Sequence, residues 1–118
     1  MLKNNNIIDS IKCAAHGLVS VFRTEKNCLF YCFNTLIFGI VNFLINVSLA
    51  SWVAYAICVA GVFATECINT AIERICDFLT SNVDERIKTI KDIAAAGVLF
   101  WGVAFYLVEI IVIGVFIC

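Results

Sequence analysis

Three long apolar runs constrain this sequence more than any other feature. They cover about residues 28–52, 53–73 and 93–118, and few charges interrupt them. A helix needs about 20 mostly apolar residues to cross a bilayer, so each run is long enough to span one. A soluble fold of 118 residues could not bury this surface, because 63% of the residues are hydrophobic. The sequence therefore predicts an all-α integral membrane protein with a single domain, residues 1–118.

The spacing of apolar residues predicts where the helices lie. Between 7 and 26, apolar positions recur every three or four residues with polar and basic residues between them, which predicts an amphipathic helix on the membrane surface. We expect membrane helices at about 29–47, 51–79 and 92–117. Three such helices make a thin bundle, so we expect neighbouring subunits to shelter its polar groups.

Positive charge is distributed unevenly along the chain. The eight basic residues lie in the N-terminal segment and around the connection between the second and third runs, at Lys3, Lys12, Arg23, Lys26, Arg74, Arg86, Lys88 and Lys91. Loops rich in lysine and arginine stay in the cytoplasm. We therefore expect the N-terminus and the second loop to be cytoplasmic, and the first loop and the C-terminus to lie outside.

A polar stripe occurs where the second run ends. Glu66, Asn69, Glu73 and Asp77 fall within about 80° of arc on one helix, at about 100° per residue. Carboxylates in a membrane helix are costly and indicate a functional site by default. Glu25, before the first run, and the pair at 91–92, before the third, are expected near the same membrane face.

This set of side chains suits phosphoryl transfer to an alcohol dissolved in the bilayer. Carboxylates hold Mg²⁺ together with phosphate oxygens, a lysine can neutralise phosphate charge, and a deeper carboxylate can take a proton from a hydroxyl. No glycine-rich phosphate loop or protein-kinase signature is present. Two non-enzymatic interpretations stay open, an ion or proton channel and an assembly subunit that uses the stripe for packing.

At these residues the sequence resembles the prokaryotic diacylglycerol kinase and undecaprenol kinase family. Residues 66–73 read E-C-I-N-T-A-I-E, followed by Asp77, and resemble the family signature E-x-x-N-(S/T)-A-I-E. Residues 91–96, K-D-I-A-A-A, resemble the family's K-D-(hydrophobic)-A-(A/S)-(A/G) motif. G-L at 17–18 and T-E-K-N at 24–27 resemble N-terminal motifs, so the likeness covers essentially the whole chain.

The resemblance implies a lipid kinase of the bacterial cytoplasmic membrane. Such an enzyme uses MgATP to phosphorylate undecaprenol or diacylglycerol at the cytoplasmic face, works as a homotrimer with sites between subunits, and has no nucleic-acid partner. Glu66 matches the catalytic base for the lipid hydroxyl, and Glu25 and Glu73 match the Mg²⁺ ligands. The expected nucleotide contacts are these two carboxylates with Asn69, Asp77, Asp84, Lys91 and Asp92.

The sequence departs from the family pattern at three places. Cys13 stands where relatives often have tyrosine, Leu29 stands where many have a basic residue, and residues 81–84 read S-N-V-D where P-E-Y-H is usual. The carboxylates are intact, so we expect an active enzyme. The T-E-K-N segment is closer to the undecaprenol kinase branch.

Overall fold

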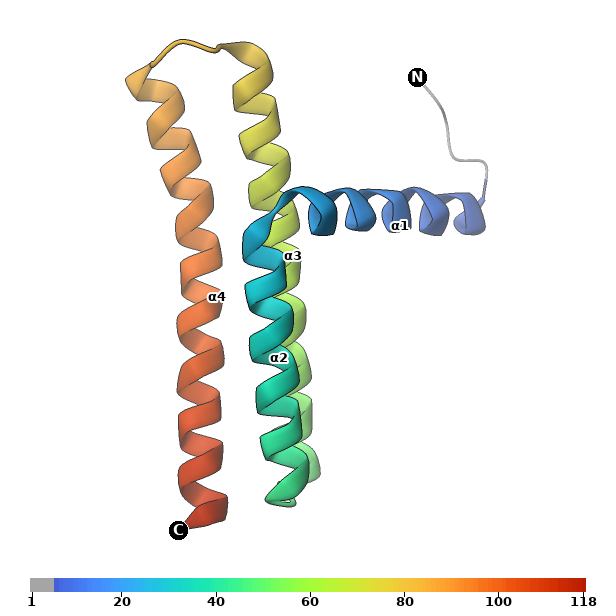
Figure 1. Ribbon diagram of the computed structural model, residues 1–118, viewed down its shortest axis with the longest axis vertical. Coiled ribbons are helices and arrows are strands. Elements are labelled where there is room, and N and C mark those ends of the chain that lie inside the picture. Colours follow the sequence, from blue (N-terminus) through green and yellow to red (C-terminus); the bar gives the residue numbers. More distant parts are fainter. Residues whose placement is uncertain (1–5) are drawn as a thin grey trace.

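Four helices make up the computed structural model, which describes residues 6–118. They are α1 (Ile7–Thr24), α2 (Lys26–Leu44), α3 (Leu49–Leu79) and α4 (Glu85–Ile117), and the described residues contain no strand. α2, α3 and α4 form an elongated bundle from which α1 projects at a steep angle (Figure 1). The three bundle helices are each long and apolar enough to cross a membrane. The predicted all-helical fold is therefore confirmed, with three candidate membrane spans.

Polar side chains cap the starts of α1, α3 and α4. The side chain of Asn6 accepts a hydrogen bond from the Asp9 amide at 2.9 Å, and Ser48 caps α3 in the same way. Asp84 caps α4 through the Arg86 amide, also at 2.9 Å. Because of this cap, α4 starts at Glu85, about two turns before the membrane segment expected from residue 92.

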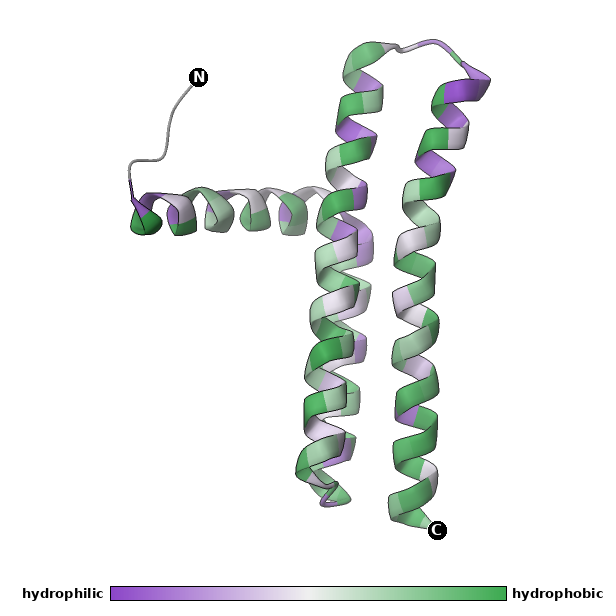
Figure 2. Cartoon of the chain, turned by 180° about the vertical axis from the view of Figure 1, so that it is seen from behind, coloured by the Kyte–Doolittle hydropathy of each residue, from purple (hydrophilic) through white to green (hydrophobic). Residues whose placement is uncertain are grey.

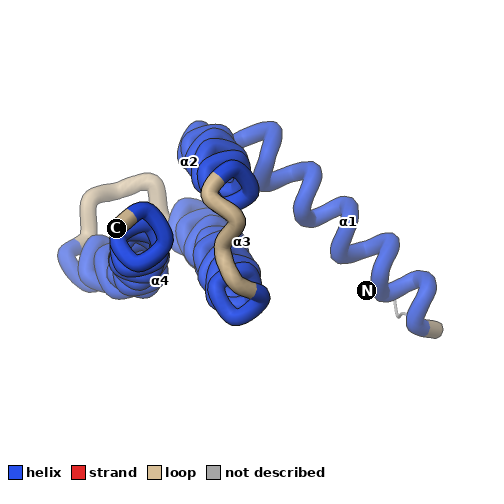
Figure 3. Tube along the Cα trace, turned by 90° about the horizontal axis from the view of Figure 1, so that it is seen from below, coloured by secondary structure: helices blue, strands red, loops and turns tan. Residues whose placement is uncertain are grey.

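The bundle is held together mainly by the packing of α3 on α4. Gly61 on α3 lets the Trp101 ring of α4 approach the backbone so closely that an added Cβ would lie 2.2 Å from a ring carbon. Cys58, Val62 and Phe105 form the buried core beside this contact. α2 packs against a neighbouring face of α3, as the end-on view shows (Figure 3).

Polar contacts hold the C-terminal end of α1 against α3. The Arg74 guanidinium donates to Ser20 Oγ at 2.9 Å and to Thr24 Oγ1 at 2.6 Å, and the Phe22 and Phe63 rings stack 5.8 Å apart. Hydrophilic residues concentrate towards the α3–α4 loop, whereas the opposite half of the bundle is mostly hydrophobic (Figure 2). The two ends of the bundle therefore suit different surroundings, water at the loop end and lipid further down.

Candidate active site

Glu66 is the most buried residue of the polar stripe on α3, with 2% of its surface exposed. Tyr31 and Cys28 of α2 lie beside it, and Glu25 and Glu73 are close enough to interact with it electrostatically. Glu25 is the one non-helical residue between α1 and α2, so the bend at this point brings its carboxylate to the bundle. Three carboxylates from two parts of the sequence, Glu25 before α2 and the pair on α3, thus lie in one region.

The side-chain amide of Asn69 adjoins one of these carboxylates, that of Glu73. Asn69 is 7% exposed and its Nδ2 donates to Glu73 Oε1 at 3.1 Å, one helical turn away. Within residues 6–118 its Oδ1 has no donor. That oxygen is available to a ligand that carries a hydroxyl or amine hydrogen.

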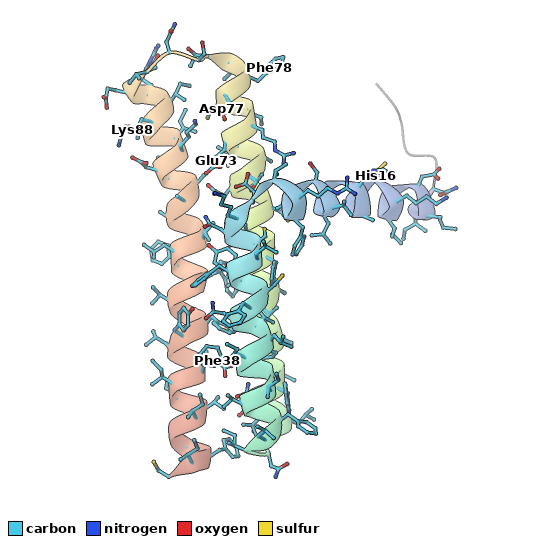
Figure 4. All side chains as sticks on the ribbon, in the orientation of Figure 1. His16, Phe38, Glu73, Asp77, Phe78 and Lys88 are labelled. Atoms are coloured by element: carbon cyan, nitrogen blue, oxygen red, sulfur yellow. The ribbon has the colours of Figure 1, made fainter. Side chains whose placement is uncertain are left out.

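Three of the residues expected to contact nucleotide form ion pairs, and these pairs lie closer to the α3–α4 loop than the three carboxylates do. Lys91 Nζ on α4 is 2.6 Å from Asp77 Oδ1 on α3, and Lys88 Nζ is 3.0 Å from Asp92 Oδ2. Figure 4 shows Glu73 near the level of α1, and Asp77 further towards the loop. Lys91 is therefore positioned near the carboxylates, whereas Asp92 pairs with Lys88 on the same helix.

Asp84 lies furthest from the buried carboxylate, at the start of α4. Its Oδ2 is 3.0 Å from a terminal nitrogen of Arg86, and this hydrogen-bonded cation keeps the pKa of Asp84 below its ordinary value. The side chain already caps the helix. The structure thus gives Asp84 a local structural role and does not bring it to Glu66.

A groove of about 580 Å³ opens beside Glu66. Its polar end is lined by Asn27, Tyr31, Glu66, Asn69 and Glu73, and its walls continue along α4 from Ala95 to Ile110. At about 1.5 Å per residue this stretch of helix is about 22 Å long. A polar end joined to a long apolar trough fits a molecule with a small polar head and a hydrocarbon chain.

The polar end of the groove contains two residues to which sequence reasoning assigned no role, Asn27 and Tyr31. Asn27 belongs to the T-E-K-N segment, and Tyr31 follows it one turn later on the same face of α2. The four-residue spacing of Asn27 and Tyr31 placed them on one face of α2, but only the packing of α2 on α3 shows that both line the groove.

The carboxylates can bind Mg²⁺ only when phosphate oxygens complete its coordination shell. Within residues 6–118, no three His, Cys, Asp or Glu side chains converge to hold a metal by themselves. Mg²⁺ is usually bound by one or two carboxylates, with substrate phosphates and waters completing its shell. Glu25 and Glu73, on either side of Glu66, fit that pattern.

Comparison with known proteins agrees with the geometry. The model of the family described as prokaryotic diacylglycerol kinase matches residues 12–113. The undecaprenol kinase of Bacillus subtilis (strain 168) is 31% identical over 99 residues, which cover 84% of this chain and 80% of that protein.

Proposed function

This chain belongs to the prokaryotic diacylglycerol kinase family, and from that premise we propose that it transfers a phosphoryl group from MgATP to undecaprenol. The family makes it a lipid kinase of the membrane. The choice of undecaprenol over diacylglycerol rests on the name of the 31% identical relative and on the T-E-K-N segment at 24–27.

The observation that carries the proposal is a buried carboxylate at the polar end of an apolar groove. Glu66 is 2% exposed, and the groove beside it runs along α4 to Ile110. A chain seated in that trough would present its hydroxyl to the Glu66 carboxylate. Glu66 would then accept the hydroxyl proton as the lipid oxygen attacks the γ-phosphorus of ATP, and ADP would leave as the bond from the γ-phosphorus to the β,γ-bridging oxygen breaks.

The shallower groups would hold the nucleotide. Glu25 and Glu73 would bind Mg²⁺, whose role is to neutralise charge on the phosphates. Lys91 would turn from Asp77 towards the phosphates, and Asn69 would fix the Glu73 carboxylate through the 3.1 Å hydrogen bond. Asp77, Asp84 and Asp92 remain predicted nucleotide contacts in this proposal.

The arrangement in the membrane is part of the proposal. α1 would lie in the cytoplasmic interface, with its apolar residues Ile7, Ile11 and Leu18 in contact with lipid; all three are exposed. The α3–α4 loop would face the cytoplasm and Cys118 the outside, in agreement with the distribution of basic residues. Composite sites in a homotrimer would complete the groove.

The decisive experiment is a transfer assay with radiolabelled ATP and purified protein in lipid vesicles. Undecaprenol and diacylglycerol are supplied side by side, and we expect label in undecaprenyl phosphate. Label only in phosphatidic acid would overturn the choice of acceptor but keep the kinase. No label in either lipid, from protein that is folded, would overturn the proposed function.

Glu66→Gln tests the assigned base within the same assay. The amide keeps the size of the side chain but cannot take a proton, so we expect turnover to fall by about 100-fold or more. Binding of MgATP, measured as thermal stabilisation, should persist, because the metal ligands are unchanged. A variant with most of the wild-type rate would remove Glu66 from the proposed role.

A further inference from the structure

A second polar cluster lies in the half of the bundle away from Glu66, next to the far apolar end of the groove. Asn42 on α2 and Glu109 on α4 are both completely buried, with 0% of their surfaces exposed. The Asn42 amide faces the Glu109 carboxyl. Yet none of their four side-chain polar atoms makes a hydrogen bond of good geometry with any residue in 6–118.

Among the residues that the structure describes, no basic side chain lies beside Glu109. Tyr55 and Cys58 face it from α3, and the Tyr55 hydroxyl donates its hydrogen to the carbonyl of Thr35. The basic residues of α2, α3 and α4 all lie towards the opposite end. The nearest along α4 is Lys91, about 27 Å away at about 1.5 Å per residue.

An ionised carboxylate in this position would be a buried charge with no compensation, which membrane proteins avoid. The neutral acid offers one O–H donor and one carbonyl acceptor. These match the carbonyl acceptor and N–H donor of the asparagine amide, so a small rotation of the two side chains satisfies both groups. With an ionised carboxylate, the Asn42 oxygen would stay without a donor.

We infer that Glu109 holds a proton and pairs with Asn42 as a neutral acid, which makes a proton-binding site in the membrane-buried half of the bundle. The inference does not rest on the proposed function, because neither residue lines the carboxylate groove. Its position does give it a structural consequence. Ile110, next to Glu109, is the last α4 residue of that groove.

The pair links two helices that touch at few places. α2 and α4 otherwise meet through the Tyr106 hydroxyl, which donates to Asn34 Oδ1 at 2.7 Å, and through the Phe38 and Phe105 rings, 5.4 Å apart. Loss of the proton would leave an uncompensated charge between α2 and α4, which would weaken this contact between the two helices.

Infrared spectroscopy of the protein in lipid vesicles tests the inference directly. A protonated carboxyl group has a C=O stretch above the amide bands, whereas a carboxylate absorbs below them. In the spectrum of wild type minus Glu109→Gln at neutral pH, we expect one protonated-carboxyl band. Asn42→Leu should shift that band to higher frequency, because the hydrogen bond to the acid is lost. Glu66→Gln is the matched control and should leave the Glu109 band in place.

Two results would overturn the inference. One is a difference spectrum that contains only carboxylate bands at neutral pH. The other is a band whose form changes when sodium replaces potassium, since that would show a bound metal cation instead of a proton. Should Glu109→Gln fail to fold, solid-state NMR of the wild-type protein with ¹³C-labelled glutamate side chains reads the same protonation state without a variant.

A thermal inactivation series separates a paired site from two independent buried groups. We expect Asn42→Leu and Glu109→Leu each to lower the inactivation temperature. The double variant should lose less than the two single losses combined, because neither partner is then left unsatisfied. Fully additive losses would show that the two side chains do not pair.

Discussion

At the scale of single residues, the depth of each carboxylate decides what it can meet. Glu66 is 2% exposed and borders an apolar groove, so it is accessible to a hydroxyl that arrives through lipid. Glu25 and Glu73 are partly exposed, and they can meet a hydrated cation and phosphates that arrive through water. In the proposed reaction the same chemical group would thus serve two purposes because its surroundings differ.

Glu73→Gln should weaken the apparent affinity for Mg²⁺ without disturbing the local geometry. The glutamine oxygen can still accept the hydrogen bond from Asn69, but it lacks the charge that attracts the metal. We expect the Mg²⁺ concentration for half-maximal rate to rise about tenfold or more, since even groups that only support metal ligands change affinity by about 10- to 100-fold.

The measurement is a Mg²⁺ titration of the phosphoryl-transfer rate. Glu85→Gln is the matched control, because Glu85 lies in the first turn of α4, is exposed and does not line the groove. Equal Mg²⁺ midpoints for Glu73→Gln and Glu85→Gln would mean that Glu73 does not bind the metal.

At the scale of helices, α3 combines the site and the packing on different faces. Glu66 and Asn69 face the groove, whereas Gly61 meets Trp101 on α4. Because one rigid helix carries both features, the contact with α4 also fixes the groove wall that α4 supplies. A change in this packing should therefore affect stability and activity together.

Gly61→Ala should destabilise the bundle. The new Cβ would lie 2.2–2.5 Å from three atoms of the Trp101 ring, so the ring or a helix must move. Overpacking of this kind costs about 1–3 kcal/mol, while the gain in helix propensity returns about 1 kcal/mol. We expect a lower unfolding midpoint in detergent micelles, monitored by tryptophan fluorescence.

Gly114→Ala is the control for this substitution, because an added Cβ there meets nothing within 4 Å. It should leave the midpoint unchanged or raise it slightly. Trp101→Leu combined with Gly61→Ala should recover part of the loss by removing the ring. If Gly61→Ala alone is as stable as the wild type, the close packing is not a determinant of stability.

At the scale of the whole molecule, one chain forms a groove that is open along one side. Leu99, Leu107 and Ile110 of its α4 wall are 67%, 55% and 66% exposed. α3 and α4 also extend past the level of α1 towards their loop (Figure 1), where the ion pairs of the predicted nucleotide region lie. A second chain placed against this side would close the groove and cover the polar stripe.

Native mass spectrometry of the detergent-solubilised protein should therefore give three copies of the 13.1 kDa chain. Glu66→Gln should assemble in the same way, because its side chain serves chemistry and is buried within one chain. A single-copy mass for active protein would contradict the homotrimer and the composite site together.

The sequence by itself determined the features that a single helix can encode. The apolar runs predicted three spans, and the spacing of Glu66, Asn69 and Glu73 placed them on one face, because helical periodicity is a local property. The Asn69–Glu73 hydrogen bond is a direct result of that spacing.

Only the tertiary structure decided which helices bring their side chains together. It placed Glu25 beside Glu66, paired Lys91 with Asp77 and showed Asp84 as a helix cap. It also set Asn42 against Glu109, two residues that look like isolated polar exceptions in the sequence. These contacts depend on the rotation and depth of each helix against its neighbours, and the pattern along one chain segment does not contain that information.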